Sequence, residues 1–303
     1  GLGDAVVSLP VLQYFIDRGE RTYLVVRSDL QRGIGERLDG LAGTIEESAL
    51  QAKDFDGKQR RLVNLREHQM QTDYWWGSQE FEQKYPGYKI NDILRLICSD
   101  IHVDANFSML KPLSFSKVTG LEQTIALIPG SDGTHKQWNT QSWLALVQLL
   151  KRRGLTPLIL GEPENNLAVE NLIEQALPWR RTATIGDAID VISSCAGIVG
   201  VDTGLTHIGV QQGVPTVTMY KRHSVYFRPY PHAVSIEAGN CDPICNQKFL
   251  SRAINSVTDF APDFAHKPWS CEVEEALRCM NQIDAQSVCD KLHSVLMRNE
   301  SER

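Results

Sequence analysis

The sequence predicts an α/β protein made of two doubly wound domains. Short apolar runs alternate with amphipathic stretches along most of the chain, and such alternation gives parallel strands with right-handed crossovers. The apolar run 198–201 is followed by an acid, Thr-Gly and a helix-like stretch, an order typical of a buried parallel strand that leads into a helix. The length of 303 residues exceeds one core of ordinary size, so two domains of roughly 150 residues each are expected.

Composition narrows the class of protein. Apolar residues make up 42% of the chain and charged residues 22%, the proportions of an ordinary globular enzyme. The net charge of −6 excludes a general nucleic-acid binder, which needs a basic face. No apolar run reaches the roughly 18 residues that span a bilayer, and no signal-peptide pattern is present. The seven cysteines are odd in number and scattered, so we expect a reducing, cytoplasmic compartment.

The first half begins with a helical pattern. Asp4 precedes a helix-like stretch that runs to Arg18, and Pro10 is tolerated in it only near the first turn or at a kink. The elements expected after it are strands at 23–26 and 62–65, an irregular polar and aromatic excursion outside the core over 67–88, and a helix over 90–101.

The chain starts directly on the glycine turn Gly1-Leu2-Gly3-Asp4. In an α/β domain such a turn normally follows a strand. We therefore expect that the first strand of this domain is not included in the chain. A sheet without that strand would expose an edge or a cleft, so the chain would be less stable than its parent.

The second half gives a clearer series of elements. Trp143, Leu144, Val147 and Leu150 fall on one helical face, which Gly154 closes. The strands expected here cover 124–128, 158–160, 198–201 and 214–219, and the helices cover 143–153, a stretch from Pro163, 188–194, 204–213 and 284–297.

We place the division between the two series near 111–114. The first domain is then 1–118, the second is 119–282, and 283–303 forms a C-terminal helix. Ligands of parallel sheets bind beyond the carboxyl ends of the strands, so two such faces suggest a central cleft between the domains. The residues that follow the strands of the second domain, and are expected to converge, are Ser131, Gly161, Asp202 and Tyr220.

The turn Asp202-Thr203-Gly204 is the strongest candidate site. It exposes backbone N–H groups at a helix N-terminus, where the helix dipole also favours an anion, and His207 lies one turn further on. Asp202 or Thr203 could instead be the N-cap of an ordinary α/β unit. On this segment alone, phosphate binding and simple capping are equally supported.

Three segments, in this order along the chain, carry a resemblance to a known family. They are Gly1-Leu2-Gly3-Asp4 through Pro10; Pro129-Gly130-Ser131 with Lys136 and Trp138; and Asp202-Thr203-Gly204-Leu205-Thr206-His207. Together they resemble the heptosyltransferases, which build the lipopolysaccharide inner core from ADP-heptose. The resemblance implies the GT-B architecture of two Rossmann-like domains, an acceptor bound by the first domain and a nucleotide sugar by the second. It also implies an inverting transfer that needs neither metal nor cofactor, next to the inner membrane where the lipopolysaccharide core acceptor lies.

A departing diphosphate needs cationic and dipolar partners. Lys136 suits a point-charge contact with phosphate, Ser131 could donate a hydrogen bond, and His207 adds a further donor. The ordinary alternatives are a solvated lysine and a serine that caps the next turn. The N–H groups of Thr203, Gly204 and Leu205 complete the anion site, and by resemblance Asp202 belongs to the same donor site.

Two acids after the strand at 158–160, Glu162 and Glu164, suit the ribose diol of the donor. Surface charge at a helix N-terminus explains them equally well.

Asp4 is the expected catalytic base, because inversion by direct displacement needs a base on the acceptor hydroxyl. An N-cap for the following helix is the alternative role of this carboxylate. For an acceptor that bears phosphates and carboxylates, we expect Gly3, Arg61 and Arg66 to contribute. Arg27, Arg32 and Arg37 give the same half a basic character, although scattered arginines are usually solvated.

Four cysteines suggest a metal site only weakly. Cys241 and Cys245, with Cys271 and Cys279 downstream, lack the paired C-x2-C spacing of ordinary zinc sites. We favour free or buried thiols and expect no metal. A metal stays open, because some heptosyltransferases that glycosylate proteins carry a metal-binding cysteine cluster.

The chain departs from the family pattern at 218–223, beside the expected donor pocket, and 246–269 is unfamiliar. Three alternatives to lipopolysaccharide heptosyl transfer therefore remain. One is a GT-B transferase that uses another nucleotide sugar or a protein acceptor. The others are a nucleotide-sugar epimerase and a non-catalytic nucleotide-sugar binding module.

Overall fold

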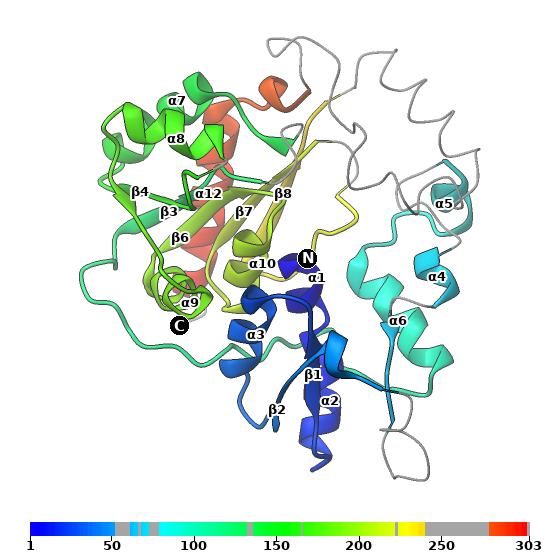
Figure 1. Ribbon diagram of the computed structural model, residues 1–303. Helices are drawn as coiled ribbons and strands as arrows, with labels where there is room; N and C mark the ends of the chain where they lie inside the picture. The colour runs from blue at the N-terminus through cyan, green and yellow to red at the C-terminus, as the bar shows by residue number, and fades with distance from the viewer. Residues whose placement is uncertain are drawn as a thin grey trace.

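The computed structural model describes residues 1–51, 61–65, 68–72, 79–131, 136–164, 166–221, 224–239 and 279–301. Its described strands form two parallel sheets (Figure 1). The smaller sheet pairs β1 (Tyr23–Val26) with β2 (Gly43–Glu46). The larger sheet has the order β5-β4-β3-β6-β7-β8. The α/β prediction of parallel sheets is confirmed.

The larger sheet is the centre of the molecule. Each residue of its middle strands β3, β6 and β7 is buried, and all its strand pairs are parallel. All carboxyl ends therefore lie along one edge. The strands are β3 (Thr124–Ile128), β4 (Thr156–Leu160), β5 (Trp179–Arg180), β6 (Gly197–Val201), β7 (Thr216–Tyr220) and β8 (Ala233–Glu237).

Helices cover both faces of this sheet because its strands alternate apolar residues between the two sides. Ile125 and Leu127 of β3 pack in a core with three helices, whereas Ala126 and Ile128 pack in a core that includes two other helices of the second half. The first group is α7 (Thr140–Arg152), α8 (Leu167–Glu174) and α12 (Ala285–Ser301), and the second is α9 (Ile185–Ser194) and α10 (Gly204–Gln211). None of the described helices is long and apolar enough to cross a membrane.

The expected helix over 4–18 is broken once. Ser8 ends α1 (Leu2–Val7) and is the N-cap of α2 (Leu9–Asp17), so Pro10 falls in the first turn of α2. This placement confirms the expectation for Pro10, because a proline in the first turn removes no intrahelical hydrogen bond. The elements that follow in this half are α3 (Asp29–Glu36), η1 (Glu47–Ala49), α4 (Gln69–Thr72), α5 (Gln79–Lys84) and α6 (Ile90–Asp100).

Two predictions in the first half are wrong. None of the described residues 61–65 lies in a strand. The excursion after residue 67 contains α4 and α5, and Met70 and Phe81 are buried in a core with α2 and α6. Spaced apolar side chains in a polar background are enough to attach this segment to α6. Trp75 and Trp76, which belong to the same stretch, lie outside the described residues.

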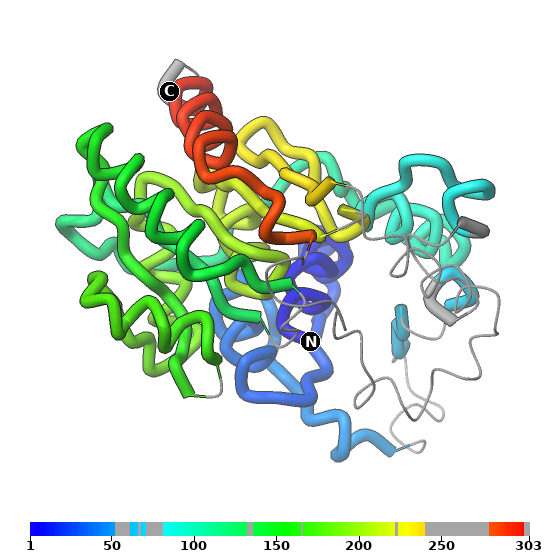
Figure 2. Tube along the Cα trace, turned by 90° about the horizontal axis from the view of Figure 1, so that it is seen from above, coloured from blue at the N-terminus to red at the C-terminus, as the bar shows by residue number. Residues whose placement is uncertain are grey.

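The start of the chain lies between the two parts of the molecule. Figure 2 shows α1, in blue, between the elements of the large sheet and α6, in cyan. Val6 and Leu9 share a hydrophobic core with Ala126 and Ile189. Residues from both sides of the expected domain boundary at 118/119 therefore share one core. The boundary stays a prediction.

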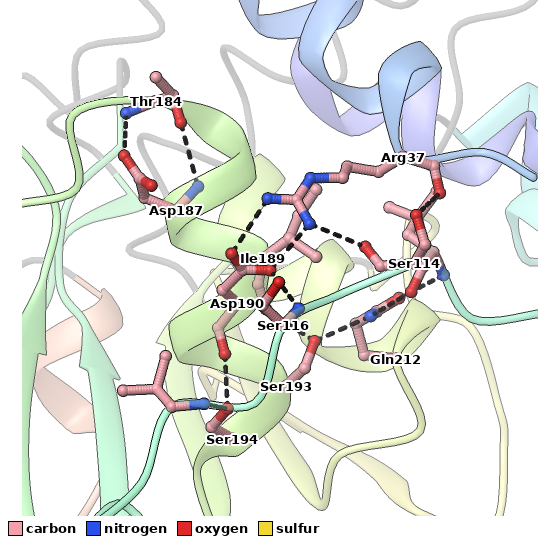
Figure 3. A network of polar contacts seen from close by, with 12 residues as sticks. Arg37, Ser114, Ser116, Thr184, Asp187, Ile189, Asp190, Ser193, Ser194 and Gln212 are labelled. Atoms are coloured by element: carbon pink, nitrogen blue, oxygen red, sulfur yellow. Dashed lines mark hydrogen bonds and ion pairs between the residues drawn. The ribbon is translucent and has the colours of Figure 1, made fainter.

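The connecting segment 111–118 is bound to α9 and α10 (Figure 3). Arg37 of α3 makes two contacts of 3.0 Å with the Asp190 carboxylate, and that carboxylate accepts a bond of 2.8 Å from the Ser116 nitrogen. Gln212 accepts from the Leu113 nitrogen at 2.7 Å and donates to its carbonyl at 3.0 Å. Side chains of the second half therefore fix the path of the connection.

Candidate functional site

An ion pair joins two neighbouring strand ends of the large sheet. Asp202 follows β6, and Lys136 lies on the loop after β3, its hydrogen-bonded neighbour. The Lys136 Nζ atom lies 2.7 Å from Asp202 Oδ2, and the side chains are 32% and 13% exposed. The pair is therefore accessible mainly from the lysine side. Ligands of parallel sheets bind at this edge.

His207 contacts the other oxygen of the same carboxylate. Its Nε2 atom lies 3.3 Å from Asp202 Oδ1, and its side chain is only 6% exposed. Burial alone would raise the pKa of the Asp202 carboxyl, but the hydrogen bond with His207 and the charge of Lys136 hold it well below its usual range. Asp202 is therefore an anion at neutral pH.

The turn before α10 has the geometry of an anion site. Thr203 is the N-cap residue, in extended conformation, and its side chain makes no capping hydrogen bond. The Asp202 carboxylate is bound to Lys136 and His207, so neither of the two side chains has the capping role that the alternative assigned to it. The first N–H groups of α10, from Gly204 onward, lack intrahelical acceptors and point out at this edge.

Two glycines let α1 approach this turn. A Cβ on Gly204 would lie 2.6 Å from Leu2 Cγ, and one on Gly3 would lie 3.2 Å from His207 Cδ2. The N-termini of α1 and α10 therefore meet directly (Figure 1). Gly3 contacts a residue of the candidate donor site, and its assignment to the acceptor stays a prediction.

Asp4 lies in the first turn of α1, beside this contact. Its side chain is 59% exposed, and its Oδ2 atom lies 2.6 Å from the Gly1 nitrogen. That contact is an ion pair with the terminal ammonium group of this chain. Asp4 is the third residue of α1 and is therefore not its N-cap. Its role as a base stays a prediction.

The expected ribose acids lie one strand further along the same edge. Arg181 pairs with Glu162 at 3.3 Å and with Glu164 at 3.1 Å, and both carboxylates are about half exposed. Near them, the Ser131 carbonyl after β3 accepts a hydrogen bond of 3.2 Å from Gln137. The structure brings these residues to the carboxyl edge, and their contacts with a donor stay predictions.

The basic character expected of the first half is largely neutralised. Arg27 and Arg32 pair with Glu47 and Glu46, and Arg37 pairs with Asp190. These three arginines are therefore paired with carboxylates, and their basic character is not available as free positive charge.

The two arginines expected to bind the acceptor stay untested. The guanidinium carbon of Arg61 lies 5.0 Å from the centre of the Phe15 ring. Arg66 lies outside the described residues.

The cysteine site falls mostly outside the described part of the chain, which excludes Cys241, Cys245 and Cys271. Cys279 is buried in the core with α7 and α12. Within the described ranges, no group of three or more His, Cys, Asp or Glu side chains could hold a metal ion.

Two further buried polar residues lie near the site, and of these the sequence singled out Tyr220 as a strand-end residue but not Arg228. Tyr220 ends β7, and its pKa is raised well above its usual range by burial and by the charge of Asp202. Arg228 is 1% exposed and donates a hydrogen bond of 2.5 Å to the His207 carbonyl. No motif marks Arg228, because a buried arginine without a carboxylate partner has no sequence signature.

Sequence comparison finds a likeness to glycosyltransferases over part of the chain. Residues 103–249 match glycosyltransferase family 9 (heptosyltransferase). Lipooligosaccharide heptosyltransferase 2 of Haemophilus influenzae is 27% identical over 128 residues. That match covers 38% of this chain and 37% of the relative, so it spans little more than a third of either protein.

Structure comparison extends the likeness in fold to nearly the whole chain. The family 9 glycosyl transferase of Veillonella parvula has 15% identity and a TM-score of 0.67, with 98% of this chain and 94% of that one covered. The E. coli ADP-heptose lps heptosyltransferase II has 13% identity and a TM-score of 0.60 over 99% and 97%.

A third similar solved structure is described as containing iron and as forming a dodecamer. The iron-containing dodecameric glycosyltransferase TibC of E. coli has 13% identity and a TM-score of 0.62, with 97% of this chain and 74% of TibC covered. The fold of all three confirms the predicted GT-B class. The chain is therefore similar to glycosyltransferase family 9 (heptosyltransferase) in sequence over residues 103–249, and similar in fold to solved glycosyltransferases over nearly its whole length.

Proposed function

We propose that the chain is an inverting glycosyltransferase that moves heptose from ADP-heptose to a lipopolysaccharide inner-core acceptor at the inner membrane. The observation that carries the proposal is the cluster of Lys136, Asp202 and His207 at the start of α10, with α1 packed against it. The match to family 9 and the likeness to lipooligosaccharide heptosyltransferase 2 of H. influenzae support a heptose donor and a lipopolysaccharide-type acceptor.

In this proposal the start of α10 holds the leaving diphosphate. Lys136 supplies positive charge, and the N–H groups of Thr203, Gly204 and Leu205 supply dipoles where negative charge develops. His207 adds a donor, and Asp202 orients Lys136 and His207. Ser131 on the neighbouring loop contributes a hydrogen bond, and Glu162 or Glu164 accepts from the ribose hydroxyls.

The transfer itself is a direct displacement. The acceptor hydroxyl oxygen attacks the anomeric carbon, the bond between that carbon and the diphosphate oxygen breaks, and the configuration inverts. Asp4 takes the proton of the attacking hydroxyl. Lys136 and the backbone dipoles carry the charge of the departing diphosphate, so the proposed step uses no metal.

Product analysis tests this function. Purified protein is incubated with ADP-heptose, with and without a heptose-deficient lipopolysaccharide core acceptor, and ADP and glycolipid are quantified. Acceptor-dependent ADP release with a glycolipid one heptose heavier is the expected result. Conversion of ADP-heptose to its epimer without an acceptor would make the chain an epimerase, and binding without turnover would make it a binding module.

Two further arms test donor and acceptor identity. Other nucleotide sugars are compared with ADP-heptose by the shift in melting temperature, and a protein acceptor replaces the glycolipid. A larger shift or faster transfer with either substitute would overturn the corresponding part of the proposal.

A further inference from the structure

Arg228 is a buried cation that pairs with no carboxylate among the residues that the structure describes. It is 1% exposed and lies in the segment 224–230, between β7 and β8. Burial lowers its pKa to about 10, so it is still charged at neutral pH. Its Nε atom is buried and has no hydrogen-bond partner within the described ranges. Its hydrogen bonds go to neutral oxygens of His207 and Gln211, and an apolar side chain would fill the same space without burying a charge. A purely structural role therefore explains Arg228 poorly.

The guanidinium of Arg228 binds α10 directly. Its Nη2 atom donates to the His207 carbonyl at 2.5 Å, and its Nη1 atom donates to Gln211 Oε1 at 2.8 Å. Gln211 in turn donates to the Lys111 carbonyl at 2.9 Å, at the start of the connecting segment. Arg228 therefore holds the backbone at the residue whose imidazole contacts Asp202.

The other residues of 224–230 bind α6, in the first half. The Val225 carbonyl accepts from the Ile90 nitrogen at 2.7 Å, and Ser224 accepts from Lys89 Nζ at 2.7 Å. The Tyr230 hydroxyl accepts from Asn91 at 3.1 Å. The segment is thus anchored at both of its ends to α6, which fixes the point from which Arg228 reaches α10.

We propose that Arg228 is a positioning residue of the donor site: it fixes the α10 backbone at His207 and so aims the imidazole at Asp202 and the leaving phosphate. The proposal rests on the proposed function for its kinetic consequence. Its structural consequence, the orientation of the imidazole, needs no substrate.

The experiment compares Arg228→Met, Arg228→Lys and the wild type. Lysine keeps the positive charge and the aliphatic part of the side chain. It lacks the planar guanidinium group that donates to the His207 carbonyl and to Gln211 Oε1 together. Arg153→Met is the matched control, since Arg153 pairs with Asp290 of α12 at 2.6 Å, away from the donor-site cluster.

Two readouts are measured for each variant. The imidazole ¹⁵N and ¹H NMR signals of His207 report its hydrogen bonding, and the NMR spectrum also gives the folded fraction. Steady-state transfer gives kcat per folded molecule and the KM for ADP-heptose.

For Arg228→Met we expect shifted His207 signals and a kcat lower by about 10- to 100-fold, because a misplaced group costs stabilisation only in the transition state. The KM for the donor should change much less. Arg228→Lys should lie between this variant and the wild type, and Arg153→Met should match the wild type. If Arg228→Met does not fold, Arg228→Lys alone must show the intermediate shift and rate.

Unchanged His207 signals and kcat in folded Arg228→Met or Arg228→Lys would overturn the proposal. A lower yield of folded protein with wild-type kcat per folded molecule would make Arg228 a stability residue only, which also overturns it. If the wild type transfers no heptose, the proposed function fails, and the His207 signals still decide whether Arg228 positions the imidazole.

Discussion

The two carboxylates of the candidate site, Asp202 and Asp4, lie in different surroundings. Asp202 is nearly buried and bound by Lys136 and His207, whereas Asp4 is mostly exposed at the start of α1. A buried, paired anion organises its neighbours, and an exposed one is accessible to a substrate hydroxyl. This contrast supports Asp202 in binding and Asp4 as the base.

Asp202 should make folding stability depend on pH. Its folded-state pKa lies below the unfolded value of about 3.9, so its contribution is present above that value and is lost as the pH falls toward the folded pKa. We expect Asp202→Asn to lower the unfolding free energy by about 2 kcal/mol at pH 7 and by less at pH 3. Urea unfolding at both pH values measures the difference. An equal loss at both would show that the charge of Asp202 contributes nothing.

Asp4→Asn should separate capping from catalysis. The amide oxygen can still accept at the helix start, so we expect the melting temperature to change little. Transfer should fall by about 100- to 10,000-fold, because the base is lost. Asp29→Asn is the matched control, since Asp29 also lies in the first turn of a helix and its side chain is 99% exposed. Turnover of Asp4→Asn close to that of the control would exclude Asp4 as the base.

At the scale of elements, the meeting of α1 with α10 decides where the candidate catalytic and donor residues lie. The contact depends on the small size of Gly3 and Gly204. Both belong to glycine-containing turns that the sequence singles out. Which helix each glycine faces could not be read from the sequence, because the contact joins segments about 200 residues apart.

Gly204→Ala should loosen this contact. The new Cβ would lie 2.6 Å from Leu2 Cγ, so we expect a loss of about 1–3 kcal/mol in unfolding free energy from overpacking. Chemical denaturation measures it. Adding Leu2→Ala to Gly204→Ala removes the Cγ and Cδ2 contacts and should recover part of the loss. If the losses in unfolding free energy of the two single variants simply add in the double variant, residues 2 and 204 are not in steric conflict.

At the scale of the whole molecule, the pair of Arg37 and Asp190 joins the two halves across the connecting segment (Figure 3). Arg37 also donates to the Ser114 carbonyl, and its own carbonyl accepts from the Ser114 nitrogen at 2.8 Å. Both charged side chains are largely buried, at 26% and 14% exposure. The pair therefore fixes how α3 and α9 lie against each other.

A double-mutant cycle measures this connection. We expect Arg37→Met and Asp190→Asn each to lower the unfolding free energy, and the double variant to lose about 1–3 kcal/mol less than the sum. Each single variant leaves one partner partly buried and unpaired, which explains the coupling. Losses that add to within about 0.5 kcal/mol would show that the pair does not connect the two halves.

Predictions from sequence succeeded where the signal is local. The apolar runs predicted the buried strands β3 and β6, and Pro10 lies in the first turn of a helix as expected. Val288, Leu292 and Val295 form the buried face of α12, also as expected. The prediction failed at 62–65 and missed β8, since a short apolar run becomes a strand only if a neighbouring strand is free to pair with it.

The sequence by itself determined the α/β class, the strand-end positions of Asp202 and Lys136, and the resemblance that the comparisons confirmed. Those features depend on periodicity and on short motifs, which act over a few residues. Only the tertiary structure decided that Lys136 and His207 bind opposite oxygens of Asp202, that α1 meets α10, and that Arg228 holds α10 from behind. These contacts join residues distant in the chain, so they exist only once the sheet and its helices are packed.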